Sequence, residues 1–476
     1  TGVVHSAPGF GEDDYRCCIQ GNVMSKQDKI VCPIDENACY TADVPKYQGR
    51  YVKECDADIA KDIKDMGRLV NKAAIVHSYP FCWRSETPLI YRAIDSWFVK
   101  VESMRSELMK SVNDTQWVPD FVKSKRFANW LEDARDWNVS RNRYWGTPLP
   151  VWVSEDFEEM VCVGSVAELE QLSGVTGITD IHRHHVDDIT IPSKRPGMPA
   201  LRRIPQVFDC WFESGSMPYA QSHYPFENKE VFENGGKFPG DFIAEGLDQT
   251  RGWFYTMLVL GTALFGKAPY KNVIVNGLVL AEDGTKMSKS KKNYPPADDI
   301  LNKYGADALR LFLVNSPVVR AEPLKFRSDG VKAVIRDVFL PLANAFKFFV
   351  QNANAWVRNG GAPLSLESAP ASTNDMDIWI QAAAQTLIKS VHDEMKAYKL
   401  YNVLPHVLPF LELLTNWYVR MNRSRLKGYD GKEQQERSLN TLLSVLFSAV
   451  RVISPFTPFL AEVLYQRLRP ALPKDI

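Results

Sequence analysis

The chain has 476 residues, 45% of them hydrophobic, and its 57 basic residues are balanced by 57 acidic ones. This composition is ordinary for a soluble globular protein, and the length corresponds to about three domains. The balanced charge excludes a general electrostatic attraction to nucleic acid, so any contact with RNA must come from local clusters. The longest apolar run, residues 253–265, is shorter than the roughly 20 residues of a membrane-spanning helix, and we expect no membrane partner.

The eight cysteines include no Cys-x-x-Cys pair. A disulfide framework is implausible in a chain of this length, and the cysteine spacing does not support a structural zinc site. We therefore expect reduced thiols and a cytoplasmic location. The chain starts at Thr1 rather than at a methionine and shows no signal peptide, so we expect it to be a piece of a longer polypeptide.

The first 150 residues predict short strands and turns combined with a few helices. The helices are expected at residues 57–66, 97–112 and 123–135. Residues 137–145 are a strand candidate. Residues 151–205 have the composition of a small insertion, in which Ser165 and Glu168 form a capping-box pattern at the start of a short helix.

Between residues 206 and 320, apolar strands alternate with helices, which favours a parallel α/β sheet. The strands are predicted at residues 241–244 and 272–280, and the helices at residues 250–265 and 307–314. After Pro323 the pattern changes to long helices with apolar residues three and four positions apart. We therefore predict an α/β fold followed by an all-α bundle.

A short lysine-rich turn follows the strand predicted at 272–280. It begins at Gly284 and carries Lys286, Met287, Ser288, Lys289 and Ser290. Two lysines on a flexible turn can bring ammonium groups to a polyphosphate as mobile point charges, which suits a leaving pyrophosphate. For an isolated turn of this kind, the alternative of a solvated basic hairpin would be preferred.

Other blocks place polar and aromatic residues at strand ends. Residues 245–253 read EGLDQTRGW, follow an apolar strand and open a helix, so their polar side chains should gather at the carboxyl edge of the sheet, where ligands bind in open α/β folds. The alternative is a helix start that carries Asp248 for its dipole. Residues 209–216 read DCWFESGS, and residues 140–150 read SRNRYWGTPLP. The arginines of the last block either reach phosphate or cap a sheet edge. For Trp211 and Trp253 taken alone, the preferred alternative is that both are core aromatics.

Together and in this order, the four blocks resemble the isoleucyl-tRNA synthetases, a class I aminoacyl-tRNA synthetase family. The surroundings of the loop are similar to the eukaryotic and archaeal branch, and the valine-specific enzymes are the next best likeness. The resemblance implies the second half of a Rossmann-like nucleotide-binding fold, an α-helical anticodon-binding bundle, and a remnant of a β-rich editing domain. We expect the editing remnant at residues 1–85, the catalytic half at 86–322 with an insertion at 151–205, and the bundle at 323–476.

The resemblance also implies roles for individual residues. Trp211 and Trp253 would form the walls of the isoleucine pocket, and Lys286 and Lys289 would hold the triphosphate. The aminoacyl-adenylate would be held by Glu245, Gly246, Asp248 and Gln249. The implied activity is activation of isoleucine by ATP, assisted by Mg²⁺ on the phosphates, and transfer to tRNA(Ile). A larger synthetase complex is a further partner that the resemblance allows.

The chain departs from the family in one respect, because it contains no His-x-Gly-His string. That motif contacts ATP in the family, so we expect this segment alone not to catalyse adenylation. Its absence also fits a catalytically inactive paralogue that binds RNA. The intact lysine loop favours the enzyme, since a binding module has no need for two mobile lysines at a nucleotide edge.

The first residues resemble the end of the family's editing domain. Gly9 and Gly11 permit a tight turn that would bring His5 and Asp14 together, and the Asp14 carboxylate would anchor the amino group of a mischarged valine. Weak selection of isoleucine over valine, followed by editing, is a known property of this family. The alternative is that His5 and Asp14 only stabilise a glycine-rich loop.

Two further clusters of charged residues and histidines are considered as binding sites. His182, His184 and His185, with Asp187 and Asp188, lack the spacing of zinc sites on one helix face, so we predict no metal there. Arginines at positions 420, 423 and 425 end an amphipathic helix. They are either a tRNA contact or a solvated face, and the sequence favours neither.

Overall fold

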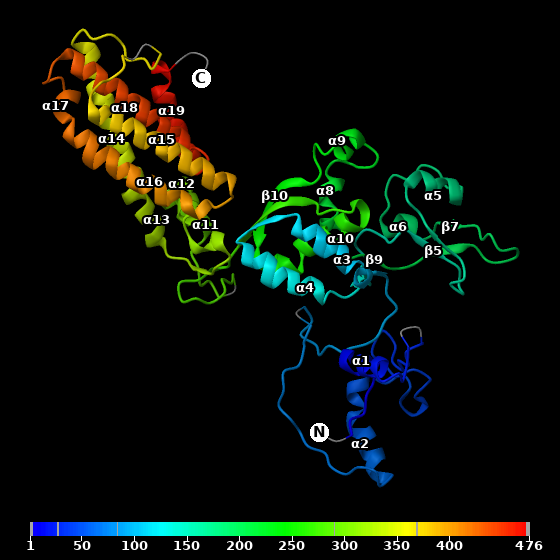
Figure 1. Cartoon of the computed structure of the whole chain (residues 1–476). Helices are drawn as coiled ribbons and strands as arrows, with labels where there is room; N and C mark the ends of the chain where they lie inside the picture. Colours follow the sequence, from blue (N-terminus) through cyan, green and yellow to red (C-terminus); the bar gives the residue numbers. More distant parts are fainter. Residues whose placement is uncertain (1–2, 26–27, 83, 290, 368–369, 473–476) are drawn as a thin grey trace. The chain divides into compact units, whose positions relative to one another are not determined.

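The structure is a computed structural model that describes residues 3–25, 28–82, 84–289, 291–367 and 370–472. The chain divides into two compact units, Thr1–Trp97 and Phe98–Ile476, and each is described by itself. The second unit contains a small parallel sheet, a separate antiparallel sheet and a set of long helices (Figure 1).

The described residues of the first unit form two α-helices, α1 (Glu12–Gln20) and α2 (Asp56–Asp65). Helix α2 confirms the helix predicted at residues 57–66, and it ends before Gly67, which has φ +68°. The short strands predicted around it are absent from the described residues of this unit. Isolated bridges such as Ile34–Tyr40 take their place, because the intervening turns leave no stretch long enough for a ladder.

The parallel sheet of the second unit has the strand order β10-β11-β2, with β2 at Gln116–Val118, β10 at Gly240–Gly246 and β11 at Tyr270–Asn276. Both strand pairs are parallel, as the strand–helix alternation predicted. Helices α3 (Arg105–Asn113) and α10 (Trp253–Phe265) pack on it through a common apolar core. Helix α10 is the long apolar run. Among the described helices, none combines the length and hydropathy needed to cross a membrane.

The strand predicted at residues 272–280 is interrupted. Strand β11 ends at Asn276, and a separate strand β12 (Val279–Leu280) pairs in parallel with β13 (Leu324–Lys325). The break lies at Gly277, whose backbone NH donates to Val318 O at 2.6 Å. A Cβ atom at Gly277 would lie 1.9 Å from Glu322 O, so only glycine allows this close approach.

Two predicted elements between residues 97 and 145 are wrong in part. The helix predicted at 97–112 begins only at Arg105, because Phe98–Val99 forms strand β1 against β3 (Trp137–Asn138). The single strand predicted at 137–145 is divided into β3 and β4 (Ser140–Arg141). In both cases pairing with distant strands overrides local periodicity.

Residues 151–205 form a four-stranded antiparallel sheet of order β6-β5-β8-β7. The strands are β5 (Val151–Val153), β6 (Met160–Cys162), β7 (Thr190–Ile191) and β8 (Leu201–Arg203). Helix α5 (Val166–Ser173) starts at the predicted cap, where Ser165 Oγ accepts from Glu168 N at 3.1 Å. The Glu168 carboxylate in turn accepts from Gly164 N at 2.7 Å. The segment has its own apolar cluster, built around Trp152 and Leu201.

The helical bundle predicted after residue 323 is confirmed. Its long helices are α14 (Leu340–Arg358), α15 (Asp375–Lys396), α16 (Val403–Glu412), α18 (Lys432–Ile453) and α19 (Pro458–Leu468) (Figure 1). Their buried faces form one extensive apolar cluster. Short helices α11 (Ala297–Tyr304), α12 (Ala306–Val314) and α13 (Ser328–Val334) connect the lysine-rich turn to the bundle.

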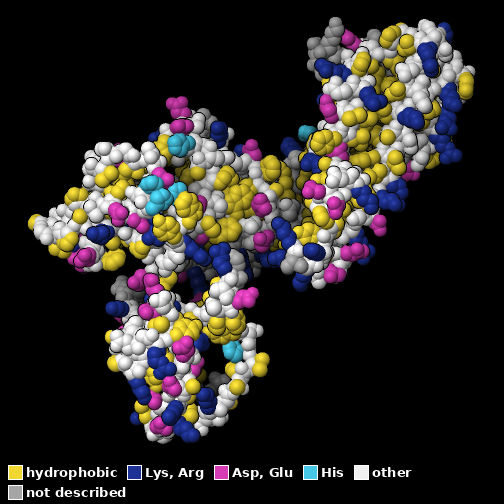
Figure 2. Space-filling view, turned by 180° about the vertical axis from the view of Figure 1, so that it is seen from behind, with side chains coloured by type: hydrophobic (Ala, Val, Ile, Leu, Met, Phe, Trp, Pro, Cys, Tyr) yellow, Lys and Arg dark blue, Asp and Glu magenta, His cyan; other side chains and the backbone are white. Residues whose placement is uncertain are grey.

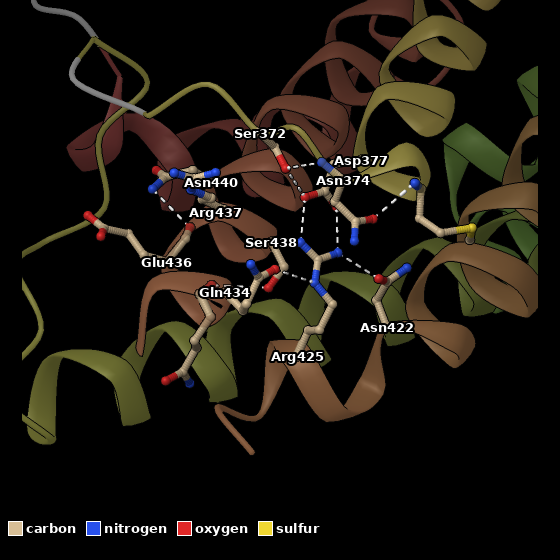
Figure 3. Close-up of polar contacts among 12 residues, drawn as sticks. Ser372, Asn374, Asp377, Asn422, Arg425, Gln434, Glu436, Arg437, Ser438 and Asn440 are labelled. Atoms are coloured by element: carbon tan, nitrogen blue, oxygen red, sulfur yellow. Dashed lines mark hydrogen bonds and ion pairs between the residues drawn. The ribbon is translucent and has the colours of Figure 1, made fainter. Parts of the chain in front are cut away.

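A fully buried carboxylate links helical segments of the bundle, and Figure 3 shows its contacts with Ser372 and Arg425. Asp377, which is 0% exposed, lies near the start of α15 and binds both terminal nitrogens of Arg425 at 3.0 and 2.8 Å. Ser372 and Tyr418 also donate to it, at 2.6 and 2.7 Å. Arg425, in α17 (Arg423–Leu426), is thus a buried structural residue and not part of a solvated face.

Candidate nucleotide site at the carboxyl end of the parallel sheet

Two of the four sequence blocks leave the sheet at one edge. In the β10–β11 ladder, Glu245 is the partner of Val275 and Gly246 the partner of Asn276. The EGLDQTRGW block therefore begins where β10 ends, and the strand that leads to the lysine-rich turn follows the end of β11. Carboxyl ends of parallel strands meet at one edge of a sheet, the usual ligand edge in open α/β folds.

The EGLDQTRGW block forms a short 3₁₀ helix (Leu247–Arg251) before α10. Gln249 is engaged within the block, since its Oε1 accepts from Trp253 N at 2.9 Å and its Nε2 donates to Asp248 at 3.3 Å. Glu245 and Asp248 are exposed, and Gly246 is half-buried. Two exposed carboxylates at a strand end can accept hydrogen bonds from ribose hydroxyls or bind an ammonium group.

Trp211 and Trp253, predicted to line one pocket, lie in adjoining positions. Trp253 Nε1 donates to Ser214 O at 2.9 Å, at the end of helix α7 (Cys210–Gly215). The Trp211 ring covers Gly252, where an added Cβ atom would lie 3.0 Å from Trp211 Cη2. Trp211 is 38% exposed and Trp253 is half-buried, so the two indoles border the surface and are not both core residues.

The placement of Trp211 depends on Asp209, the first residue of its block, for which the sequence analysis predicted no role. Asp209 is buried, caps α7 by accepting from Trp211 N at 3.3 Å, and binds Arg141 at 2.8 Å and Trp137 Nε1 at 3.1 Å. Arg141 of the SRNRYWGTPLP block thus holds Asp209 at the start of the DCWFESGS block. An aspartate before a short helix is a recognisable cap, but its distant partners could not be read from the sequence.

The lysine-rich turn has a defined backbone. Leu280 of β12 forms an antiparallel bridge with Lys286, and Ala281 N donates to Thr285 O at 2.9 Å. Gly284, with φ +87°, provides the left-handed residue that this reversal requires. Asp283 accepts from Thr285 N and Oγ1, both at 2.8 Å, and these bonds hold the pKa of Asp283 below its ordinary value.

Asn293 braces the two arms of this turn and was not predicted as a functional residue. Its Oδ1 accepts from Ser288 N at 2.9 Å, and its Nδ2 donates to Lys286 O at 3.1 Å and to Thr285 Oγ1 at 3.0 Å. One amide thus fixes the backbone on both sides of Met287. An asparagine after two lysines carries no spacing signal that would have revealed this role.

The lysines of the turn are presented to solvent. Lys286 and Lys289 are exposed, and within the described part of the chain neither ammonium group has an ion-pair partner. Met287 and Ser288 are half-buried, and Ser290 lies outside the described residues. Two unpaired cations beside a braced backbone form an arrangement that can take up a multiply charged anion.

The predicted editing residues belong to the first unit. Asp14 is in the first turn of α1, and its carboxylate folds back so closely on Gly11 that an added Cβ atom there would lie 2.4 Å from Oδ2. His5 is exposed in the segment before the helix. Among the described residues, no hydrogen bond or ion pair joins His5 to Asp14, so the role of this pair stays a prediction.

The histidine-rich segment gathers rings on the surface (Figure 2). Asp180, His184 and His185 offer atoms that lie within 4.8 Å of one another. Asp180 is already engaged by His182 Nδ1 at 2.6 Å, and Trp145 stacks on the His182 ring at 4.2 Å. The Asp187 named with these histidines binds Arg183 and Arg203 instead. That no metal binds here stays a prediction.

Comparison with protein families identifies two matching regions. Residues 21–325 match the family "tRNA synthetases class I (I, L, M and V)", and residues 377–475 match the "Anticodon-binding domain of tRNA ligase". The chain is also similar to curated proteins over nearly its whole length. A Caenorhabditis elegans protein named "Isoleucine--tRNA ligase, cytoplasmic" is 58% identical, over 98% of this chain and 41% of its own length.

Other relatives carry similar names. "Isoleucine--tRNA ligase, cytoplasmic" of Schizosaccharomyces pombe is 56% identical over 100% of this chain and 44% of its own length. "Isoleucine--tRNA ligase" of Bdellovibrio bacteriovorus is 52% identical over 99% and 43%. The chain thus spans less than half the length of these relatives.

A solved structure shares the fold. Mycobacterium tuberculosis methionyl-tRNA synthetase in complex with methionyl-adenylate aligns with a TM-score of 0.58 at 15% sequence identity, over 95% of this chain and 79% of that chain. At this identity the likeness concerns the fold alone. It agrees with an α/β region followed by a helical bundle. The family match, which covers more than half of the chain, shows that this protein belongs to the class I tRNA synthetases.

Proposed function

We propose that this chain is the part of a cytoplasmic isoleucyl-tRNA synthetase that carries the lysine loop and the anticodon-binding bundle. The observation that supports this proposal most directly is the lysine-rich turn that follows β11 of the parallel sheet. Asn293 braces the backbone of this turn, and among the described residues Lys286 and Lys289 have no ion-pair partners. Relatives that are 52–58% identical and named isoleucine–tRNA ligases support the choice of isoleucine over valine. Membership of a larger synthetase complex stays a prediction.

The proposed reaction has two steps. An isoleucine carboxylate oxygen attacks the α-phosphorus of ATP, the bond to the bridging oxygen breaks, and pyrophosphate leaves with the negative charge. A hydroxyl of the terminal ribose of tRNA(Ile) then attacks the carbonyl carbon of the adenylate, and AMP leaves. Lys286 and Lys289 would stabilise the charge that develops on pyrophosphate.

Mg²⁺ is expected to arrive with ATP. The turn offers ammonium groups, and its carboxylate Asp283 already accepts two bonds from Thr285. Phosphate oxygens would therefore hold the ion, which usually keeps few protein ligands in such sites. We assign no further step to it.

The helical domain is the proposed contact for the anticodon arm. It carries exposed aromatic and apolar side chains among scattered Lys and Arg residues (Figure 2), including Trp417 at 49%, Met421 at 63% and Tyr429 at 76% exposed. Unpaired bases of RNA loops stack on such rings, and basic side chains hold the phosphates. Arg420 and Arg423 remain available for this contact, whereas Arg425 is buried.

The test of the proposed function is isoleucine-dependent exchange of pyrophosphate with ATP by the full-length protein. Exchange that requires isoleucine, together with charging of tRNA(Ile), would support the enzyme. Binding of tRNA without exchange would instead support the inactive RNA-binding paralogue, and exchange that prefers valine would support the valine-specific enzyme.

Replacing Trp253 by alanine is expected to raise the Michaelis constant for isoleucine by about tenfold, since the contact of even one methylene is worth a factor of this size or more. The opened pocket should also admit larger amino acids. Steady-state exchange with isoleucine and bulkier analogues measures both effects. Trp379→Ala is the matched control, because Trp379 is a half-buried indole of α15 in the helical domain and is assigned no contact with a substrate. Unchanged isoleucine kinetics in Trp253→Ala would remove Trp253 from the pocket.

Replacing Asp14 by alanine is expected to leave isoleucine activation near the parental rate while valyl-tRNA accumulates. A carboxylate–ammonium hydrogen bond is charge-assisted, so its loss should slow deacylation of valyl-tRNA by about tenfold to a hundredfold. Release of valine from preformed valyl-tRNA is the measurement. Asp13→Ala is the control, because Asp13 lies beside Asp14 on α1 and pairs with Arg16. Parental deacylation by Asp14→Ala would leave Asp14 as a loop residue only.

A further inference from the structure

A third lysine lies beside the lysine-rich turn, although it is 36 positions further along the chain than Lys289. Lys325 is the last residue of β13, and its ladder partner is Leu280 of β12. Leu280 also forms the antiparallel bridge with Lys286. Lys325 and Lys286 are therefore on the two strands that flank Leu280.

Residues that are direct partners in a ladder project to the same face of a sheet. The other face is identified by Val279 and Leu324, which pack in one apolar cluster with Val318 and Val319. Because neighbouring residues of a strand alternate between faces, Leu280, Lys325 and Lys286 lie on the opposite face. Lys325 and Lys286 are both exposed, as this alternation requires.

The side chain of Lys325 reaches the turn itself. A Cβ atom added to Gly284 would lie 2.9 Å from Lys325 Cε and 3.3 Å from its Nζ. The two nearby carboxylates have other partners, since Glu282 pairs with Arg327 at 3.4 Å and Asp283 accepts from Thr285. Within the described residues, Lys325 has no ion-pair partner.

We propose that Lys325 is a third phosphate-binding residue of the lysine loop, which contacts the polyphosphate of a nucleoside triphosphate from the face shared with Lys286. The inference rests on the proposed function and adds a residue to the same site. Its physical basis is that two ammonium groups on one face repel each other, and an anion between them relieves the repulsion. Because Lys325 belongs to a paired strand and not to the turn, it binds the anion in the ground state and the transition state alike.

The test is isoleucine-dependent pyrophosphate exchange by the full-length enzyme with Lys325→Met, which keeps most of the aliphatic stem over Gly284 and removes the charge. The Michaelis constant for ATP should rise by about tenfold or more, as expected for the loss of a hydrogen bond to a charged group, and kcat should change by less than about twofold. Lys325→Arg should restore most of the affinity. Lys332→Met, an exposed lysine of α13, is the matched control and should behave like the parent.

Three results would overturn the inference. A parental Michaelis constant in Lys325→Met would show that the charge has no role. A fall in kcat with an unchanged Michaelis constant would show that Lys325 only positions the turn. Absence of exchange in the parent enzyme would remove the proposed function together with this inference, whereas a parent that is active and sensitive to Lys286→Met isolates a failure at Lys325 alone.

Discussion

Replacing Lys286 or Lys289 by alanine in the full-length enzyme should slow adenylate formation by about 100-fold or more, the usual effect of removing one stabiliser of developing charge. Isoleucine binding should change far less. The negative charge on pyrophosphate grows as the bond to the α-phosphorus breaks, so the lost stabilisation falls on the transition state. Both lysines are exposed on a turn whose backbone Asn293 holds in place, so alanine removes the charge without removing a packing contact.

Isoleucine-dependent pyrophosphate exchange measures this effect, and equilibrium binding of isoleucine provides the comparison. Lys291→Ala is the control, because Lys291 is an exposed lysine in the same stretch that is assigned no contact with phosphate. Exchange at the parental rate in both Lys286→Ala and Lys289→Ala would disprove the assignment of the loop. An equal loss in Lys291→Ala would point to the general charge of the segment and not to two specific lysines.

Replacing Asp377 by alanine should destabilise the helical domain by about 3–5 kcal/mol, the usual cost of leaving one partner of a buried ion pair uncompensated. Asp377 is the common acceptor for Arg425, Ser372 and Tyr418. Without Asp377, the guanidinium of Arg425 has no counter-charge, although its side chain is buried and only 10% exposed. Hydrogen exchange of amides in α15 and α18 measures the loss locally, which avoids assuming two-state unfolding of a multidomain chain.

The control variant is Asp375→Ala, since Asp375 is an exposed aspartate in the first turn of the same helix. A double variant, Asp377→Ala with Arg425→Met, should recover much of the stability because no unpaired charge remains buried. If the double variant is as unstable as the sum of the single ones, the pair is not coupled in the way that the structure indicates.

The ionisation of the Asp377 carboxylate should also make the stability of the helical domain depend on pH. Burial alone would raise the pKa of Asp377, but hydrogen bonds from Arg425, Ser372 and Tyr418 outweigh burial and hold the pKa below its ordinary value. A lowered pKa in the folded state means that the ionised form stabilises the fold. This contribution is complete above the pKa of an unfolded aspartate, about 4, and is lost as the pH falls below it. In Asp377→Asn this loss on acidification should be smaller.

The sequence by itself determined the features that depend on local order along the chain. Apolar positions three and four residues apart are enough to predict the helices of the bundle, because each helix buries one stripe. The residues of the four blocks, which carry the family resemblance, are contiguous and could be read directly. The cap at Ser165 was also correct, since a capping box is contained within four residues.

Only the tertiary structure decided which distant residues meet. Asp209 meets Arg141, Asp377 meets Arg425, and Lys325 reaches the turn at Gly284, across 68, 48 and 41 positions of sequence. Strand register and burial create these contacts, and neither leaves a periodic signal. The helix expected at residues 97–112 was wrong at its start for the same reason, because Phe98 pairs with Asn138. Local periodicity predicts which face of a helix or strand is apolar, whereas the packing of the whole chain determines which element covers that face.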